Sequence, residues 1–79
     1  MRVSGRVRLV GSASMSEIVI TGTDREWYVA MEDKDKLFDL QQRIVTVEGE
    51  ETVVELKFVN GKSAGQRRIL RNIKIIAME

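Results

Sequence analysis

Hydrophobic and polar residues alternate along most of this chain of 79 residues. A period of two places successive side chains on opposite faces of a strand, so the alternation predicts a mostly β protein. Strands are expected at residues 3–10, 17–21, 26–31, 43–48, 53–59 and 68–76. Polar and glycine-containing segments separate them, including a loop at residues 11–16 and a turn that makes residues 17–31 a hairpin.

The alternation gives way to a helical spacing between the third and fourth strands. Over residues 33–42, Leu37 and Leu40 recur at a spacing of three, which predicts a short helix. Asp33 or Asp35 is suited to cap its first turn. The expected order is therefore three strands, a short helix and three more strands.

The length of the chain limits how this order can fold. A chain of this size buries only about 60% of its unfolded surface, so one core uses nearly all of its apolar residues. We therefore expect a single domain over residues 1–79. Closing the small sheet into a barrel hides its strand edges, and the helix then covers one open end with Leu37, Phe38 and Leu40.

The composition excludes several kinds of chemistry. The chain has no histidine, cysteine or proline, which removes the usual zinc sites, disulfides, and thiol or imidazole nucleophiles. The acidic groups lie on expected turns and exposed faces, where nothing prepares them for general acid or base catalysis. We expect no enzyme activity, no catalytic residue and no cofactor. No apolar run approaches the roughly 20 residues of a membrane-spanning helix.

A cluster of carboxylates surrounds Gly49. Glu48, Glu50 and Glu51 resemble the oxygen-rich surroundings that calcium prefers, but their spacing is not that of a calcium-binding loop. Charged side chains on a turn also discourage pairing between sheet edges. We interpret the cluster as a solvated turn that ends the fourth strand, and we expect no metal site.

Charge is unevenly distributed along the chain, although the net charge is only +1. Residues 1–12 carry three arginines and no acidic residue, and residues 57–79 carry six basic residues and one acidic residue. Residues 13–56 carry four basic residues against eleven acidic ones. If the first and last strands are neighbours, they bring together a basic patch of Arg6, Arg8, Arg67, Arg68 and Arg71. Such a patch suits single-stranded nucleic acid, whereas the acidic second and third strands oppose phosphate.

Trp27 and Tyr28 are adjacent on the third strand and therefore point to opposite faces. One ring is expected to enter the core and the other to lie outside, and the alternation does not decide which. The outer ring either stacks on a base or joins a protein interface, where large amphipathic rings are common.

The last hairpin contains an expected loop at residues 60–67, which begins with Asn60 and Gly61. If the two strands fold symmetrically about Ser63, Glu55 lies opposite Arg71. Opposite charges facing each other across two strands contribute about 0.2 to 1 kcal/mol. Part of the basic character would then be local ion pairing.

Several segments of the chain together carry a resemblance. They are Gly5 within the first strand, VRLVG at 7–11, EIVI at 17–20, Trp27-Tyr28, RIVTVEG at 43–49 and NGKSAGQRRILRNIKI at 60–75. They resemble small bacterial OB-fold domains, and the last segment is similar to the final hairpin of small uncharacterised envelope proteins of that fold. The resemblance implies an all-β fold with one short helix: a small OB-fold-like antiparallel β-barrel with the helix between strands 3 and 4.

The same resemblance implies a noncatalytic binding or interaction module whose ligand is unknown. Trp27 and Tyr28 are its expected contact residues, and its partner is a protein, peptide or glycan. The alternative is a weak single-stranded nucleic-acid binder that uses the five arginines of the patch. Weak self-association is a third hypothesis. The location is the periplasm or cell envelope if a leader has been removed, and otherwise the cytoplasm.

Overall fold

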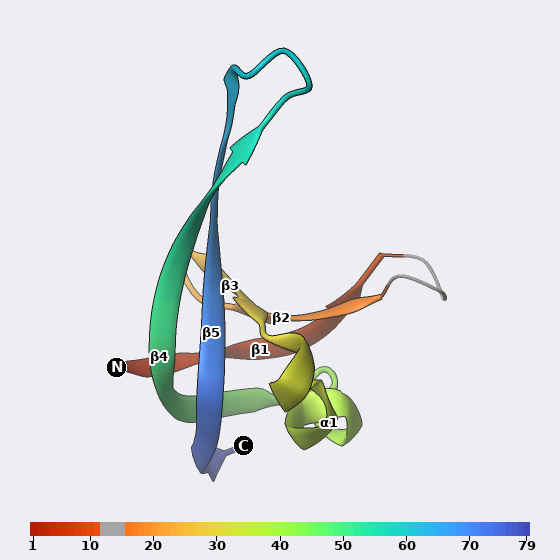
Figure 1. Ribbon diagram of the computed structural model, residues 1–79. Coiled ribbons are helices and arrows are strands. Elements are labelled where there is room, and N and C mark those ends of the chain that lie inside the picture. Colours follow the sequence, from red (N-terminus) through yellow and green to blue (C-terminus); the bar gives the residue numbers. More distant parts are fainter. Residues whose placement is uncertain (12–15) are drawn as a thin grey trace.

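The structure is a computed structural model that describes residues 1–11 and 16–79. It is mostly β, and its strands are β1 (Arg2–Val10), β2 (Glu17–Thr21), β3 (Glu26–Val29), β4 (Ile44–Lys57) and β5 (Ser63–Met78) (Figure 1). A short helical segment joins β3 to β4 and consists of η1 (Met31–Asp33), α1 (Lys34–Leu37) and η2 (Phe38–Leu40). The expected loop at 11–16 contains residues 12–15, which lie outside the described residues.

The strands form one closed sheet in the order β1-β2-β3-β5-β4, with β4 returning to β1. All neighbouring strands are antiparallel except β3 and β5, which are parallel and pair through Tyr28 with Ile69 and Val29 with Leu70. The first and last strands are therefore not neighbours, because β4 separates them on one side and β2 and β3 on the other. This corrects the assumption that placed their arginines in one patch.

The alternating hydrophobic residues fill the interior of this sheet. Side chains from every strand form one buried cluster, which includes Val3, Val7, Ile18, Ile20, Trp27, Val29, Val45, Val47, Leu70 and Ile73. Gly5 lets β1 pass close to β2, because a Cβ there would lie 2.5 Å from the carbonyl oxygen of Thr21. The predicted period of two thus identifies most of the core.

Two of the expected strands are one. Residues 43–48 and 53–59 were expected to be separated by a turn at Gly49, but β4 runs through that position without ending. Gly49 instead allows close strand approach, since a Cβ there would lie 2.9 Å from the carbonyl oxygen of Arg71. Opposite it, β5 contains a bulge in which Asn72 adopts a positive φ of 54°. Gly49 therefore lies at a bend within β4 and does not end the strand.

The helical segment covers one end of the closed sheet, as expected, but not with all three predicted residues. Leu37 is fully buried in the core, and Leu40 packs against it. Phe38 is 46% exposed, so its expected role in the core is wrong. No helix among the described residues is long and apolar enough to span a membrane.

Asp33 precedes α1 as expected, but its side chain does not cap the helix. Its carboxylate instead accepts hydrogen bonds from the backbone N–H groups of Asn72 (2.9 Å) and Ile73 (3.3 Å) on β5. Lys36 donates to the same carboxylate at 2.6 Å and to the carbonyl of Ile73 at 2.9 Å. Asp33 therefore ties the helical segment to the bulge. Burial alone would raise the pKa of Asp33, but these hydrogen bonds outweigh it and lower that pKa below its usual 3.8.

The hairpin between β4 and β5 turns earlier than expected. The N–H of Gly61 donates to the carbonyl of Phe58 at 2.9 Å, and the N–H of Phe58 donates to the carbonyl of Lys62 at 2.8 Å. Gly61 has a φ of 85°, as a tight turn followed by a glycine bulge requires. The expected loop at 60–67 is therefore too long, because β5 begins at residue 63.

The earlier turn also changes the cross-strand pairs. Glu55 lies opposite Gln66, and Arg71 lies opposite Glu50, so the predicted pairing of Glu55 with Arg71 is wrong. The symmetry about Ser63 fails because the turn is centred on Asn60, between the hydrogen-bonded residues Phe58 and Lys62.

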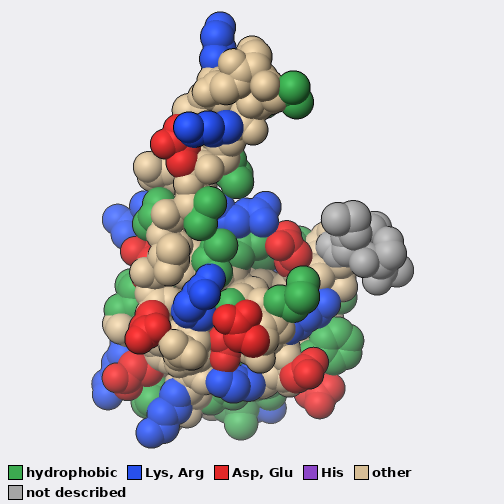
Figure 2. Space-filling view, viewed as in Figure 1, with side chains coloured by type: hydrophobic (Ala, Val, Ile, Leu, Met, Phe, Trp, Pro, Cys, Tyr) green, Lys and Arg blue, Asp and Glu red, His purple; other side chains and the backbone are tan. Residues whose placement is uncertain are grey.

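The outer half of this hairpin projects from the closed sheet as a free arm, which we define as residues 53–68 (Figure 1). The pairing of β4 with β1 ends at Glu48, and that of β5 with β3 begins at Ile69. The projection gives the molecule principal extents of 43 × 29 × 23 Å. Space-filling atoms of the arm stand clear of the barrel in Figure 2.

Leu37 and Phe38 are adjacent in the helical segment and provide a matched test of the core. We expect Leu37→Ala to lower the free energy of unfolding by about 2 to 5 kcal/mol, because it removes a fully buried side chain and leaves a cavity. Phe38→Ala should cost much less, since Phe38 is half exposed. Urea unfolding followed by Trp27 emission measures both, and equal losses would contradict the burial described here.

The Asp33 contacts predict a pH dependence. Because the fold lowers the pKa of Asp33, its stabilisation is fully present above the unfolded value of 3.8 and is lost as the pH falls through the folded pKa. Asp33→Asn should lower the free energy of unfolding at pH 7 by about 1.5 to 3 kcal/mol, as expected for losing hydrogen bonds to a charged group. The difference in free energy of unfolding between the unmodified protein and Asp33→Asn should decrease below about pH 4. Unfolding curves at a series of pH values measure this difference. A difference that does not change with pH would argue against stabilisation by the charged Asp33 carboxylate.

Candidate binding site

The two adjacent aromatic residues of β3 separate as predicted, and the structure decides which one faces inward. Trp27 is only 9% exposed and belongs to the core. Its Nε1 donates a 2.7 Å hydrogen bond to Oε2 of Glu51, and Nε of Arg68 lies 3.9 Å from the same oxygen. Tyr28 is half-buried on the outer face. Of the two expected contact residues, only Tyr28 therefore has its ring available to a partner.

Arg67 stacks on the Tyr28 ring. Its guanidinium carbon lies 3.9 Å from the ring centroid. The parallel pairing of β3 with β5 produces this contact, because Tyr28 lies beside Ile69 and Arg67 shares the outer face two residues earlier. Nη1 of Arg67 also lies 3.3 Å from Oε1 of Glu17 on β2. The stack on Tyr28 and the ion pair with Glu17 thus connect β5, β3 and β2 on the outer surface.

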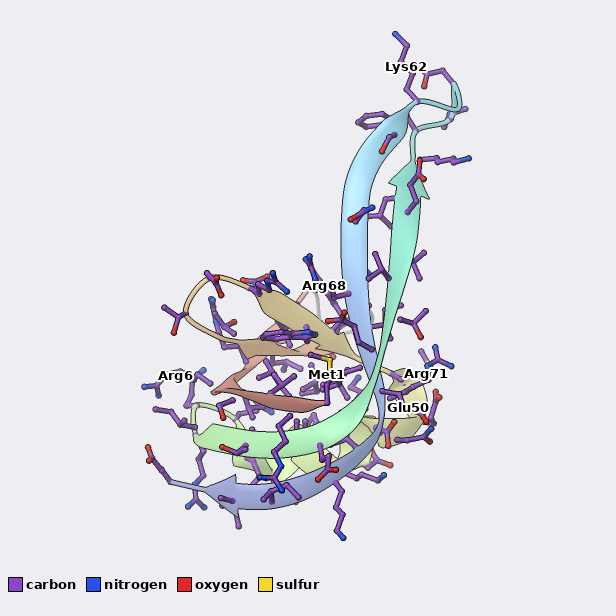
Figure 3. The ribbon with its side chains drawn as sticks, turned by 90° about the vertical axis from the view of Figure 1, so that its left-hand side faces the viewer. Met1, Arg6, Glu50, Lys62, Arg68 and Arg71 are labelled. Carbon is purple, nitrogen blue, oxygen red and sulfur yellow. The ribbon has the colours of Figure 1, made fainter. Side chains whose placement is uncertain are left out.

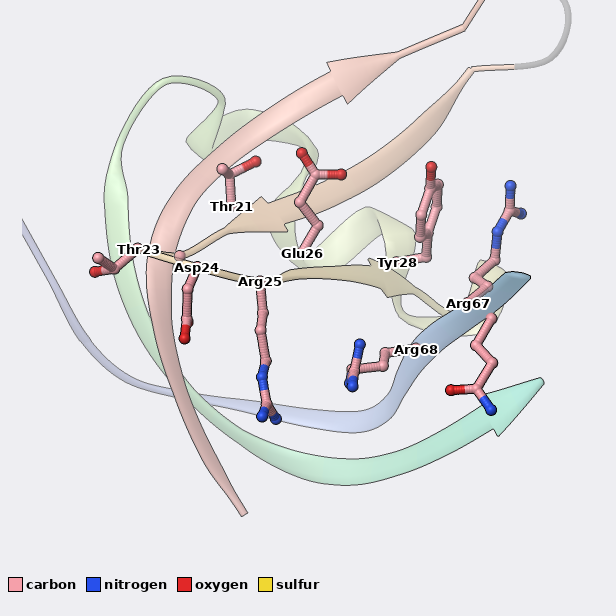
Figure 4. Close-up of a pocket in the computed structure, with 10 residues that line it drawn as sticks. Thr21, Thr23, Asp24, Arg25, Glu26, Tyr28, Arg67 and Arg68 are labelled. Atoms are coloured by element: carbon pink, nitrogen blue, oxygen red, sulfur yellow. The ribbon is translucent and has the colours of Figure 1, made fainter. Parts of the chain in front are cut away.

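Two clefts meet at this stack. The larger has a volume of about 550 Å³ and is lined by Thr21, Gly22, Thr23, Asp24, Arg25, Glu26, Tyr28, Gln66, Arg67 and Arg68 (Figure 4). The smaller has a volume of about 170 Å³ and is lined by Glu17, Tyr28, Val29, Ala30, Met31, Glu32, Arg67, Ile69 and Arg71. Tyr28 and Arg67 belong to both. We call the two clefts together the β3–β5 groove.

The charges of the β3–β5 groove are balanced. Its basic residues are Arg25, Arg67, Arg68 and Arg71, and its acidic residues are Glu17, Asp24, Glu26 and Glu32. Several are already paired, as Arg67 is with Glu17, and Nη1 of Arg71 lies 3.9 Å from Oε1 of Glu32. A partner therefore meets both signs of charge along the groove, which is different from a uniformly basic channel.

The five arginines of the expected basic patch divide into two groups. Arg67, Arg68 and Arg71 lie along the β3–β5 groove. Arg6 and Arg8 lie on β1, and Arg6 donates from Nη1 to the carbonyl of Gln42. Figure 3 shows Arg6 well apart from Arg68 and Arg71. Their expected gathering is wrong because β5 does not pair with β1.

The groove also contains residues that the sequence did not single out. Arg25 and Glu26 were assigned to a turn and a strand, and the cleft forms only because that turn lies across from Gln66 and Arg67. Thr21 lines the same cleft, and its Oγ1 is buried without a hydrogen-bond partner among the described residues. No pattern in the chain predicts this set, since it depends on the β3–β5 pairing.

The three carboxylates around Gly49 contact different partners. Oε2 of Glu48 lies 3.7 Å from Nε of Arg2, while Glu50 accepts a 2.7 Å hydrogen bond from Nδ2 of Asn72 and Glu51 binds Trp27. Within residues 1–11 and 16–79, no three acidic side chains are placed to hold a metal ion. The cluster lies within a strand and not on the solvated turn that we expected.

No protein-family model, no curated protein and no solved structure matches this chain.

The stack of Arg67 on Tyr28 can be measured by a double-mutant cycle. We expect Tyr28→Ala and Arg67→Ala to couple by about 0.5 to 1 kcal/mol in the free energy of unfolding, the usual size of an exposed cation–π contact. The pair Tyr28→Ala and Arg6→Ala serves as a control and should show no coupling, because Arg6 contacts Gln42 instead. Equal coupling in both cycles would mean that the effect does not come from the stack.

Proposed function

We propose that this chain is a noncatalytic OB-fold module that binds its partner along the β3–β5 groove. The fold assignment is supported by the closed order β1-β2-β3-β5-β4 with a helical segment between β3 and β4. OB-folds are five-stranded Greek-key barrels that bind ligands on the face of strands 2 and 3 and on the flanking loops. Tyr28 and Glu17 lie on that face here, and the arm corresponds to a flanking loop.

The observation that carries the binding proposal is the Tyr28–Arg67 stack where two clefts meet. Tyrosine and arginine are the residue types that most often anchor protein interfaces. A ring whose plane is held by a guanidinium loses little conformational freedom when a partner packs on it. The stack is therefore a preformed contact surface, and the clefts on either side accept an extended segment.

The balance of charge favours a partner that is itself polar and of mixed charge. Basic and acidic side chains both line the groove near the stack. Arg25 and Glu26 line the same cleft, and Arg71 lies close to Glu32. A phosphate polymer would meet the carboxylates unfavourably, whereas a peptide segment can offer both signs. We therefore favour an extended peptide segment of a protein partner over a glycan.

Single-stranded nucleic acid is the second candidate, and one feature of the larger cleft favours it. Arg25, Arg67 and Arg68 outnumber Asp24 and Glu26 there, and Tyr28 presents an aromatic ring beside them. Bases stack on such rings while arginines contact the backbone. Binding of this kind would weaken steeply with salt because it releases counterions.

Two probes separate these candidates. Peptides of random sequence are selected on the immobilised protein, and labelled oligo-dT and oligo-rU are titrated at about 50 and 200 mM salt. We expect the selected peptides to lose about tenfold in affinity for the Tyr28→Ala, Arg67→Ala double variant and to bind an Arg6→Ala control like the unmodified protein. Peptides that bind all three proteins alike would exclude the groove. Oligonucleotide binding that depends on salt and on Arg67, without peptide selection, would support the second candidate instead.

A further inference from the structure

The tip of the arm exposes apolar side chains at the point farthest from the core. The tip consists of residues 56–63, and neither the closed sheet nor the helical segment packs on it (Figure 1). Phe58 is 61% exposed, Val59 is fully exposed, and Leu56 is also exposed. Val59 and Asn60 are the central residues of this turn, and a turn of this kind does not require an apolar residue there, so the geometry of the hairpin does not explain why Phe58 and Val59 are apolar.

Hydrogen bonds fix the backbone of the tip. Phe58 both donates to the carbonyl of Lys62 and accepts from the N–H of Gly61, which fixes the backbone on both sides of Val59. The side chain of Asn60 accepts a further hydrogen bond from the N–H of Lys62 at 3.1 Å. The tip is therefore an ordered turn that presents its apolar residues outward.

The tip carries two lysines and no acidic residue, and Glu55 directly precedes it on the arm. Residues 56–78 carry six basic residues and no acidic residue. Lys57 directly precedes Phe58, Lys62 pairs with Phe58 across the hairpin, and Lys62 extends from the end of the arm (Figure 3). Figure 2 shows blue basic side chains along the arm, with red acidic atoms beside the lower of them. The complementary surface must be anionic and must also accept apolar groups.

We propose that the tip docks on an anionic lipid bilayer, with Phe58 and Val59 inserted at the level of the headgroups and Lys57 and Lys62 against the lipid phosphates. Apolar insertion combined with basic residues is how proteins attach to the surface of a bilayer without spanning it. A bilayer accepts a convex wedge of this kind without a preformed pocket. The contact is independent of the groove and its ligand.

The shape and charge of the tip favour lipid over other occupants. Two copies of this chain that met through their tips would bring the four lysines at positions 57 and 62 together, which like charge disfavours. A nucleic acid would use the lysines and the Phe58 ring, but it gives no role to an aliphatic side chain such as Val59, which has no face on which a base stacks. A bilayer uses all four residues at once.

Docking through the tip would also place the β3–β5 groove near the bilayer. Gln66, Arg67 and Arg68 line the groove at the base of the arm, on the same strand that leads to the tip. The arm would therefore act as a spacer between the lipid surface and the groove.

Cosedimentation with vesicles tests this proposal. The full chain is mixed with vesicles of phosphatidylcholine alone and with vesicles that contain about 30% phosphatidylglycerol. We expect binding only to the anionic vesicles, and weaker binding at high salt. The double variant Phe58→Asp, Val59→Asp and the double variant Lys57→Gln, Lys62→Gln should each lose about tenfold in binding.

Phe38→Asp is the matched control, because Phe38 is also an exposed phenylalanine but lies in the helical segment, at the opposite end of the molecule from the arm (Figure 1). It should bind vesicles like the unmodified protein. Trp27 emission and the unfolding midpoint verify that each variant is folded. In a Phe58→Trp variant, the new tryptophan should shift its emission to the blue with anionic vesicles and be quenched by brominated lipid.

Several outcomes would overturn the proposal. One is failure of the unmodified protein to bind anionic vesicles at low salt, and another is binding by both tip variants equal to that of the unmodified protein. Loss of binding in Phe38→Asp equal to that in the tip variants would assign the effect to general apolar exposure. A dimer in sedimentation that the tip variants dissociate, without vesicle binding, would assign the tip to a second copy of the chain. Loss of oligonucleotide binding in the tip variants, again without vesicle binding, would assign it to nucleic acid.

Discussion

The carboxylate of Asp33 connects the parts of this molecule that give it its shape. It accepts hydrogen bonds from the N–H groups of Asn72 and Ile73 and from the ammonium of Lys36. A buried charge is tolerated only when it is paired and hydrogen-bonded, so these contacts are required and not incidental. They hold the bulge in β5 against the helical segment. The bulge in turn sets the bend opposite Gly49, from which the long hairpin leaves the closed sheet.

That bend allows β5 to serve three purposes along its length. Its last residues complete the sheet against β4, its middle closes the sheet by pairing with β3, and its first residues form one side of the arm. The groove lies between the second and third of these regions, where Arg67 reaches Tyr28. A single strand therefore positions the candidate binding surface relative to both the core and the tip.

The sequence predicted the parts of the fold that depend on local pattern and missed those that depend on pairing. Alternation identified most of the core, and the helical spacing identified Leu37. It did not decide between Trp27 and Tyr28, because opposite faces are equivalent until a partner strand covers one of them. Gly49 was misinterpreted because a glycine that ends a strand and one that lets two strands approach look the same in sequence. The groove was not predictable for a related reason: Arg25 joins it only through the parallel pairing of β3 with β5, which unites segments about 40 residues apart and leaves no local signal.

The same parallel pairing is also the shortest seam in the closed sheet. It consists of two residue pairs, whereas β1 pairs with β2 and with β4 through five each. Opening of a native protein begins where the fewest backbone hydrogen bonds must break, so amide exchange in the barrel should start at this seam. A ligand that spans Tyr28 on one side and Arg67 on the other would act as a latch across it. Ligand bound in the groove would then stabilise the whole barrel by mass action. Its affinity could be measured from slower hydrogen exchange of amides that do not contact the ligand.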